Sequence, residues 1–273
     1  MQTQIEFTHK NVVVIGGTSG INRGIAECFA RHGAKVAVAS RNQDKVDETV
    51  VSLKQLGAEA MGFTADVRNE QELRNGLQMV AADWGHFDIV VSGAAGNFPA
   101  LANSMSGNAF KSVIDIDLLG TFHVMQAIYP YLIKPGACVI NISAPQAFLS
   151  MVAQSHVCAA KAGVDMITRC LAMEWGPDGI RINSVVPGPI EGTEGMKRLA
   201  PTPEFLQKAT NSVPLKRLGR PEDVGNLCLF LASPMASFIS GAVIPVDGGW
   251  SLGGASSLGD TLAKILQQMQ AQQ

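Results

Sequence analysis

A glycine-rich turn close to the amino terminus has the residue types that bind phosphate. It follows the apolar run Val12-Val13-Val14-Ile15 and precedes a helix-like segment. Glycines let the backbone turn tightly and approach a pyrophosphate, and the start of the following helix favours an anion. A tight turn without a ligand is the alternative, because many folds use such glycines. After the first strand of an alternating pattern, however, the turn predicts a dinucleotide site with these cofactor contacts: Gly16, Thr18, Ser19, Gly20 and Ile21.

The end of the second predicted strand indicates which dinucleotide is bound. An acidic residue at this place would bind the adenosine ribose hydroxyls and favour NAD. This sequence has Ser40-Arg41 instead. A guanidinium forms charge-assisted hydrogen bonds with a phosphate, such as the 2′-phosphate of NADP. Ser40 and Arg41 therefore predict NADPH as the cofactor, with a solvated surface arginine as the alternative.

Strand-like and helix-like segments alternate along the chain and must position these residues. Short apolar runs bounded by turns are typical of buried parallel strands, and the longer segments between them are typical of helices. This alternation predicts an α/β fold with a seven-stranded, doubly wound parallel sheet of the Rossmann type, flanked by helices. We expect one domain over 1–273, an irregular substrate lid over 192–211, and a carboxy-terminal tail over 251–273. The predicted strands include Val12–Ile15, Lys35–Ser40, Ile89–Val91, Cys138–Ile140, Ile180–Val186 and Ala242–Val246, and the predicted helices include Ile21–His32, Gln43–Leu56, Asn69–Trp84, Phe110–Tyr131 and Ala153–Trp175.

Composition and charge narrow the function classes. The formal net charge of −2 argues against nucleic-acid binding, which usually needs a basic face. No stretch approaches the roughly 20 uncharged apolar residues that span a bilayer, so no membrane association is expected. The five cysteines are scattered without the spacing of metal ligands or a disulfide framework. We therefore expect no metal, and a location in the reducing cytoplasm.

Further motifs resemble the short-chain dehydrogenase/reductase superfamily over nearly the whole chain. Asp66-Val67 is similar to the pair that brackets the adenine, and Pro187-Gly188-Pro189-Ile190 to the segment that holds the nicotinamide carboxamide. The glycine turn departs from the superfamily at Asn22, where a third glycine is usual. We expect this change to shift the loop slightly without abolishing binding. The resemblance implies these additional cofactor contacts: Asp66, Val67, Ala94, Lys161, Pro187, Gly188 and Ile190.

A narrower resemblance is to 2,4-dienoyl-CoA reductases of the peroxisomal type. It is carried by Ala94-Ala95-Gly96-Asn97-Phe98, Asp115-Ile116-Asp117 and Glu174-Trp175-Gly176-Pro177. Those enzymes reduce a 2,4-dienoyl thioester of coenzyme A with NADPH to a 3-enoyl thioester. The resemblance implies Asn97 and Phe98 as substrate contacts, with a plain loop as the alternative, and it implies a homotetramer.

The proton donor that is usual in the superfamily is missing. Carbonyl-reducing members carry Tyr four residues before an active-site Lys, and Ser thirteen residues before that Tyr. Lys161 is the matching lysine, but Val157 and Ala144 occupy the other two positions. The chain has only two tyrosines, Tyr129 and Tyr131, and neither is near this register.

The missing tyrosine favours reduction of a conjugated double bond over reduction of a ketone. Hydride addition to a ketone leaves an alkoxide, which needs a well-placed acid at once. Hydride addition to a dienoyl thioester leaves a dienolate, whose oxygen needs hydrogen-bond donors and whose carbon can take a proton from an ordered water. By resemblance, Lys161 lies at the nicotinamide ribose, and Asp117 helps it to position that water. A solvated Lys161 and a structural hydrogen bond of Asp117 are the alternatives.

Two further residues are candidates for catalysis. A histidine can act as an acid near neutral pH, which makes His156 a candidate acid, and a structural role at the helix start is the alternative. Ser143 follows the fifth strand, from which it would reach the thioester or the cofactor, or cap local backbone. Two other functions stay open: a carbonyl or 3-ketoacyl reductase that uses a non-tyrosine acid, and a non-catalytic NADP-binding protein.

Overall fold

The computed structural model describes residues 5–200 and 202–255, and its centre is a parallel sheet of seven strands. The strand order is β3-β2-β1-β4-β5-β6-β7, so the direction of winding reverses between β1 and β4. At such a switch point the loops at the carboxyl ends of the strands diverge and leave a crevice for ligands. The predicted sheet is therefore confirmed. Its strands are β1 (Asn11–Ile15), β2 (Lys35–Ser40), β3 (Ala60–Thr64), β4 (Ile89–Ser92), β5 (Cys138–Ile142), β6 (Arg181–Pro187) and β7 (Val243–Val246).

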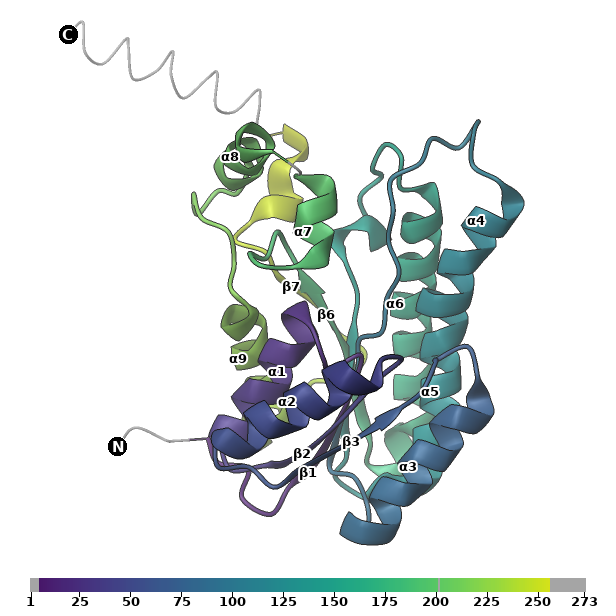
Figure 1. Cartoon of the computed structure of the whole chain (residues 1–273), viewed down its shortest axis with the longest axis vertical. Helices are drawn as coiled ribbons and strands as arrows, with labels where there is room; N and C mark the ends of the chain where they lie inside the picture. The colour runs from purple at the N-terminus through teal and green to yellow at the C-terminus, as the bar shows by residue number, and fades with distance from the viewer. Residues whose placement is uncertain (1–4, 201, 256–273) are drawn as a thin grey trace, which may run out of the picture.

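Helices cover both faces of the sheet (Figure 1). All residues of the strands β1, β4 and β5 are buried, which explains why these strands appear in the sequence as continuous apolar runs. Two apolar cores result, one on each side of the sheet. The helices on one face are α1 (Gly20–Arg31), α2 (Gln43–Gln55) and α9 (Pro221–Ala232), and those on the other are α3 (Glu70–Trp84), α5 (Gly120–Ile128) and α6 (Ser155–Trp175).

The helix predicted over Phe110–Tyr131 is interrupted, which corrects that expectation. It divides into α4 (Gly107–Val113), the π-helical segment η1 (Ile114–Leu119), α5, and the 3₁₀ turn η2 (Tyr129–Tyr131). The wider π turn changes the direction in which side chains point. It leaves Asp117 only 1% exposed, whereas Asp115 pairs near the surface with Lys111 at 2.5 Å.

The segment predicted as an irregular lid is largely helical, which is a second correction. It forms α7 (Glu194–Leu199) and α8 (Pro203–Ser212). The Thr193 hydroxyl begins α7 because it accepts a hydrogen bond from the Met196 backbone N–H at 3.2 Å. The 3₁₀ turns η3 (Pro145–Ala147), η4 (Gly176–Asp178), η5 (Pro234–Ala236) and η6 (Trp250–Ala255) complete the elements, and most of the predicted tail lies outside the described residues.

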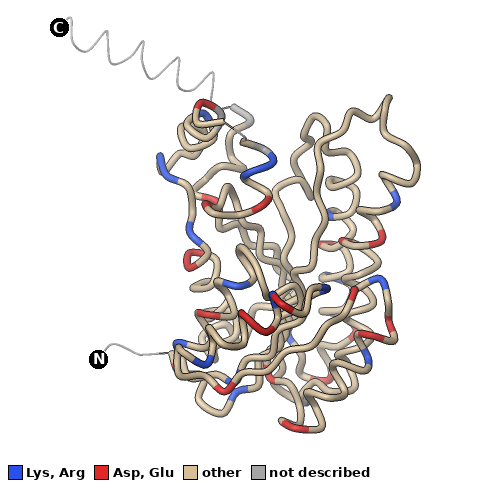
Figure 2. Tube along the Cα trace, viewed as in Figure 1, with Lys and Arg blue, Asp and Glu red and all other residues tan. Residues whose placement is uncertain are grey.

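Acidic and basic residues are interspersed along the trace in Figure 2, in keeping with the small net charge. None of the helices in the described ranges has the length and hydropathy that crossing a membrane requires.

Candidate active site

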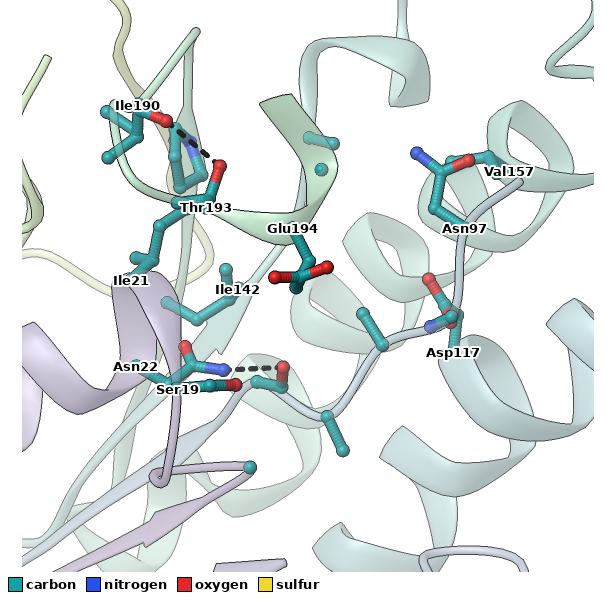
Figure 3. Close-up of a pocket in the computed structure, with 18 of the residues that line it drawn as sticks. Ser19, Ile21, Asn22, Asn97, Asp117, Ile142, Val157, Ile190, Thr193 and Glu194 are labelled. Atoms are coloured by element: carbon teal, nitrogen blue, oxygen red, sulfur yellow. Dashed lines mark hydrogen bonds between the residues drawn. The ribbon is translucent and has the colours of Figure 1, made fainter. Parts of the chain in front are cut away.

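A cavity of about 820 Å³ opens at the carboxyl ends of the central strands. This volume is typical of a site for a cofactor or a substrate. Figure 3 shows that its walls come from the glycine turn, from the loop after β4, and from η1, α6 and the lid. Most of the residues predicted from the sequence line it, namely Gly16, Thr18, Ser19, Ile21, Ser40, Arg41, Asp66, Val67, Ala94, Asn97, Asp117, Ser143, Lys161, Pro187, Gly188 and Ile190.

The glycine turn has the geometry that a closely approaching dinucleotide needs. Gly16 has φ +79°, and a Cβ there would lie 2.9 Å from the backbone N of Ala94. Gly20 has φ +53° and begins α1, although it lies outside the cavity lining. Side chains are disfavoured at both positions, and at Gly16 bare backbone faces the cavity. The residues at this end therefore fit a bound nicotinamide dinucleotide.

The part of the cavity that is predicted to hold the adenosine of the cofactor, here called the adenosine end, carries exposed charges. Arg41 follows β2, and Lys45 lies in the first turn of α2; both are exposed and line the cavity. Asp66 follows β3, and its carboxylate pairs with Arg68 at 2.5 Å. That hydrogen bond is the main reason why the pKa of Asp66 lies below its usual value. Lys45 was missed in the sequence, although its place four residues after Arg41 at a helix start was a usable signal.

The part of the cavity where the predicted catalytic residues lie, here called the reacting end, holds a buried ion pair. Lys161 Nζ lies 3.4 Å from Asp117 Oδ2, and the two residues are only 5% and 1% exposed. Lys161 also donates to the Ile142 carbonyl oxygen at 2.9 Å. The other carboxylate oxygen, Asp117 Oδ1, accepts from the Gly96 backbone N–H at 2.6 Å. Asp117 Oδ2 has no hydrogen-bond partner within the described residues, so it is the acceptor that remains for a ligand.

The two positions that lack hydroxyl groups belong to the wall of the same cavity. Val157 and Ala144 both line the cavity, so apolar side chains stand where the superfamily has Tyr and Ser. Tyr129 and Tyr131 lie outside the lining. They form η2, near the amino ends of β4 and β5, where the Tyr129 hydroxyl donates to Asp178 at 2.5 Å. The structure therefore brings no tyrosine of the described chain to the reacting end.

His156 and Phe98 pack together behind the cavity wall. His156 is fully buried, its ring lies 4.6 Å from the Phe98 ring, and its Nε2 is 2.9 Å from the Phe98 carbonyl oxygen. Neither residue lines the cavity. These contacts support the loop after β4, and in this conformation the predicted acid and the predicted substrate contact lie outside the cavity lining.

Ser143 lines the cavity, but its hydroxyl is covered. The Ser143 Oγ atom is buried and lies next to the carboxyl group of Asp165. Asp165 follows Lys161 by one turn of α6. Burial raises the pKa of Asp165, although hydroxyls of Ser143 and Ser184 and the charge of Lys161 partly oppose this effect. No local sequence pattern indicates Asp165, because its burial depends on the packing of α6 against β5 and β6.

The lid reaches across the cavity to the loop after β4. Arg198 Nη1 of α7 donates a hydrogen bond to the Asn97 carbonyl oxygen. Thr193 Oγ1 donates to the Ile190 carbonyl oxygen at 2.9 Å, which fixes the start of the lid (Figure 3). Glu194 and Met196 also line the cavity and were not singled out in the sequence. The lid therefore covers the space between the cofactor residues and Asn97.

Comparisons with known proteins agree with this arrangement. A family model described as "Enoyl-(Acyl carrier protein) reductase" matches residues 16–251. A peroxisomal 2,4-dienoyl-CoA reductase, (3E)-enoyl-CoA-producing, from Rattus norvegicus is 41% identical over 242 residues, which cover 88% of this chain and 83% of the relative. A short chain dehydrogenase from Bacillus anthracis superimposes with a TM-score of 0.80 at 36% identity, covering 89% of this chain and 96% of the other. A 7α-hydroxysteroid dehydrogenase complexed with NADH has a TM-score of 0.85 at 31% identity, over 90% and 96% of the two chains.

Proposed function

Because this chain belongs to the short-chain dehydrogenase/reductase superfamily, we propose that it reduces a 2,4-dienoyl-CoA thioester to a 3-enoyl-CoA with NADPH. The observation that carries this proposal is the composition of the reacting end. A buried Asp117–Lys161 pair faces the cavity, and Val157 and Ala144 stand where a carbonyl reductase needs hydroxyl groups. The name of the rat relative specifies the same substrate and a 3E product.

A nicotinamide cofactor supplies the hydride in this superfamily, and the glycine turn would hold its pyrophosphate. Arg41, with Lys45 beside it, would pair with a 2′-phosphate, which is the basis for proposing NADPH instead of NADH. Asp66 and Val67 would bracket the adenine, and Pro187, Gly188 and Ile190 would contact the nicotinamide end. All of these residues line the cavity.

The ion pair would position the proton source. An ammonium group has three N–H donors. Lys161 directs one donor to Ile142 O and another towards Asp117, so a third is left for the cofactor ribose or a water. Asp117 Oδ2 would accept one hydrogen bond from that water, whose other proton then goes to the α-carbon of the dienolate, which leaves the double bond between carbons 3 and 4. The hydroxide that remains takes a proton from solvent. Positive charge from Lys161, which is 5% exposed, would stabilise the developing negative charge in this nearly buried position.

The location and assembly of the protein remain proposals. All five cysteines are free thiols, which fits a reducing compartment such as the cytoplasm, whereas the rat relative is named as peroxisomal. A homotetramer is proposed from the superfamily resemblance alone.

The test is NADPH oxidation at 340 nm with trans,trans-2,4-hexadienoyl-CoA, with acetoacetyl-CoA and a 2-enoyl-CoA as matched thioesters. We expect turnover of the dienoyl thioester alone, and a 3-enoyl product in the proton NMR spectrum. Rapid reduction of acetoacetyl-CoA without dienoyl turnover would show a carbonyl reductase. Tight NADPH binding without turnover of any thioester would show a non-catalytic binding protein.

A further inference from the structure

Asn22, which stands where the superfamily usually has a glycine, connects two walls of the cavity. Its Nδ2 donates a hydrogen bond to the Gly93 carbonyl oxygen at 2.7 Å (Figure 3). Asn22 lies in the first turn of α1, and Gly93 follows β4, so the bond joins segments 71 residues apart. A Cβ at Gly93 would lie 2.3 Å from Asn22 Oδ1. The asparagine and the glycine therefore depend on each other sterically.

The loop that begins at Gly93 is held at its other end by the catalytic carboxylate. Gly96 N–H donates to Asp117 Oδ1 at 2.6 Å, and Asp117 Oδ2 lies 3.4 Å from Lys161 Nζ. Only Ala94 and Ala95 thus lie between Gly93, which accepts from Asn22, and Gly96, which donates to Asp117. A shift at Gly93 would be transmitted over this short segment to the ion pair.

Asn22 lines the cavity, and the hydrogen bond that its side chain makes is to the protein. Its Oδ1 is buried and has no hydrogen-bond partner among the residues described, and its Nδ2 is occupied by Gly93. We propose that Asn22 is a positioning residue, which couples the cofactor-binding turn to the Asp117–Lys161 pair through residues 93–96. This inference rests on the proposed role of that pair in proton transfer.

The test compares Asn22→Gly, Gly93→Ala and the double variant. Asn22→Gly should lower kcat about tenfold, since a misplacement of about 1 Å can cost about 100-fold and one lost hydrogen bond displaces the loop by less. The KM for NADPH should change less than about threefold, and the solvent deuterium isotope effect on kcat should rise. Gly93→Ala alone should be more damaging because of the steric clash. The double variant should recover activity relative to Gly93→Ala.

Asn11→Ala is the matched control. Asn11 also holds a loop, since its Nδ2 donates at 2.8 Å to the carbonyl oxygens of both Trp84 and His86. It does so at the amino ends of the strands, away from the cavity at their carboxyl ends. We expect this variant to lower Tm and to leave the isotope effect unchanged.

Two outcomes would overturn the inference. A lower Tm in Asn22→Gly, with kcat and isotope effect as in the wild type, would show a merely structural bond. A large rise in the KM for NADPH at unchanged kcat would show a cofactor contact. Dienoyl-CoA turnover by the wild type is measured first and judges the proposed function by itself. The variants are then compared on whichever thioester the wild type reduces, so the two failures are distinguishable.

Discussion

The two ends of the cavity treat charge in opposite ways. At the adenosine end, Arg41 and Lys45 are exposed, and Asp66 pairs with a partly exposed Arg68. At the reacting end, Asp117 and Lys161 are almost completely buried and hold each other at 3.4 Å. One end resembles an ordinary polar surface, whereas the other resembles a protein interior that contains two charges.

Because of this difference, we expect the residues that select the cofactor and the residues that carry out the reaction to respond differently to mutation. Exposed charges are screened by salt, with a Debye length of about 8 Å at physiological ionic strength, so each contributes modestly. A buried charge that loses its partner is costly, by about 3–5 kcal/mol. Changes at the adenosine end should therefore alter which cofactor binds, and changes at the reacting end should alter the rate and the stability together.

The largest effect is expected from breaking the buried pair. Asp117→Ala and Lys161→Ala should each lower kcat about 100- to 1000-fold, because the first removes the acceptor that holds the proton-donating water and the second removes the positive charge at the dienolate. Asp117→Ala also leaves Lys161 unpaired and removes the acceptor of the Gly96 N–H, so its Tm should fall. Steady-state kinetics at 340 nm and thermal unfolding measure both quantities.

Asp115→Asn is the matched control for that experiment. Asp115 lies on the same π-helical segment, but it pairs with an exposed Lys111. It should change kcat less than about twofold, because exposed pairs of this kind contribute about 0–1 kcal/mol. A loss comparable to that of Asp117→Ala would mean that the segment as a whole, and not the buried carboxylate, is required.

An intermediate effect is expected at the adenosine end. Arg41→Ala should raise the KM for NADPH about tenfold and leave the KM for NADH nearly unchanged, because only NADPH has the 2′-phosphate. The difference between wild type and variant should shrink at high salt. An equal loss with both cofactors would show that Arg41 supports the loop instead of reading the phosphate. Arg31→Ala, which removes an exposed arginine paired with Glu27, is the control.

The smallest effect concerns the carboxyl beneath the reacting end. Burial raises the pKa of Asp165 above that of the unfolded chain, about 3.9. The folded protein then holds the proton more tightly, so this residue's contribution to stability falls as pH rises from about 4 to the raised pKa. Asp165→Asn removes that titration, and its Tm relative to wild type should increase over the same window, by a few degrees at most. A difference in Tm that stays constant with pH would contradict this explanation.

The sequence predicted best what depends on local pattern. Buried strands such as Val12–Ile15 appear as apolar runs, and helix starts such as Asn69, whose side chain accepts from the backbone of Glu72, appear as capping residues. The glycine turn and Arg41 were predicted from short segments in the same way, and both line the cavity. The lid helices were missed, although Thr193 before α7 and Pro203 at the start of α8 are recognisable start signals.

What could not be predicted depends on contacts between distant segments. The bond between Asn22 and Gly93 forms only when α1 meets the end of β4. The burial of His156 against Phe98 and the burial of Asp165 near Ser143 likewise require the packed fold. The conformation of residues 114–119 was also invisible, because a π turn and an α turn have similar sequence requirements.

That π-helical segment has a consequence for how the gene can change. In an α-helix each residue advances by about 100°, so removing one residue between 114 and 119 would rotate everything on one side of the deletion relative to the other. Asp117 and the buried face of α5, which includes Val124 and Met125, could not both keep their places. Single substitutions within residues 114–119 can be tolerated one at a time, whereas an insertion or deletion there would displace several buried residues at once. The length of this segment should therefore stay fixed as related sequences diverge.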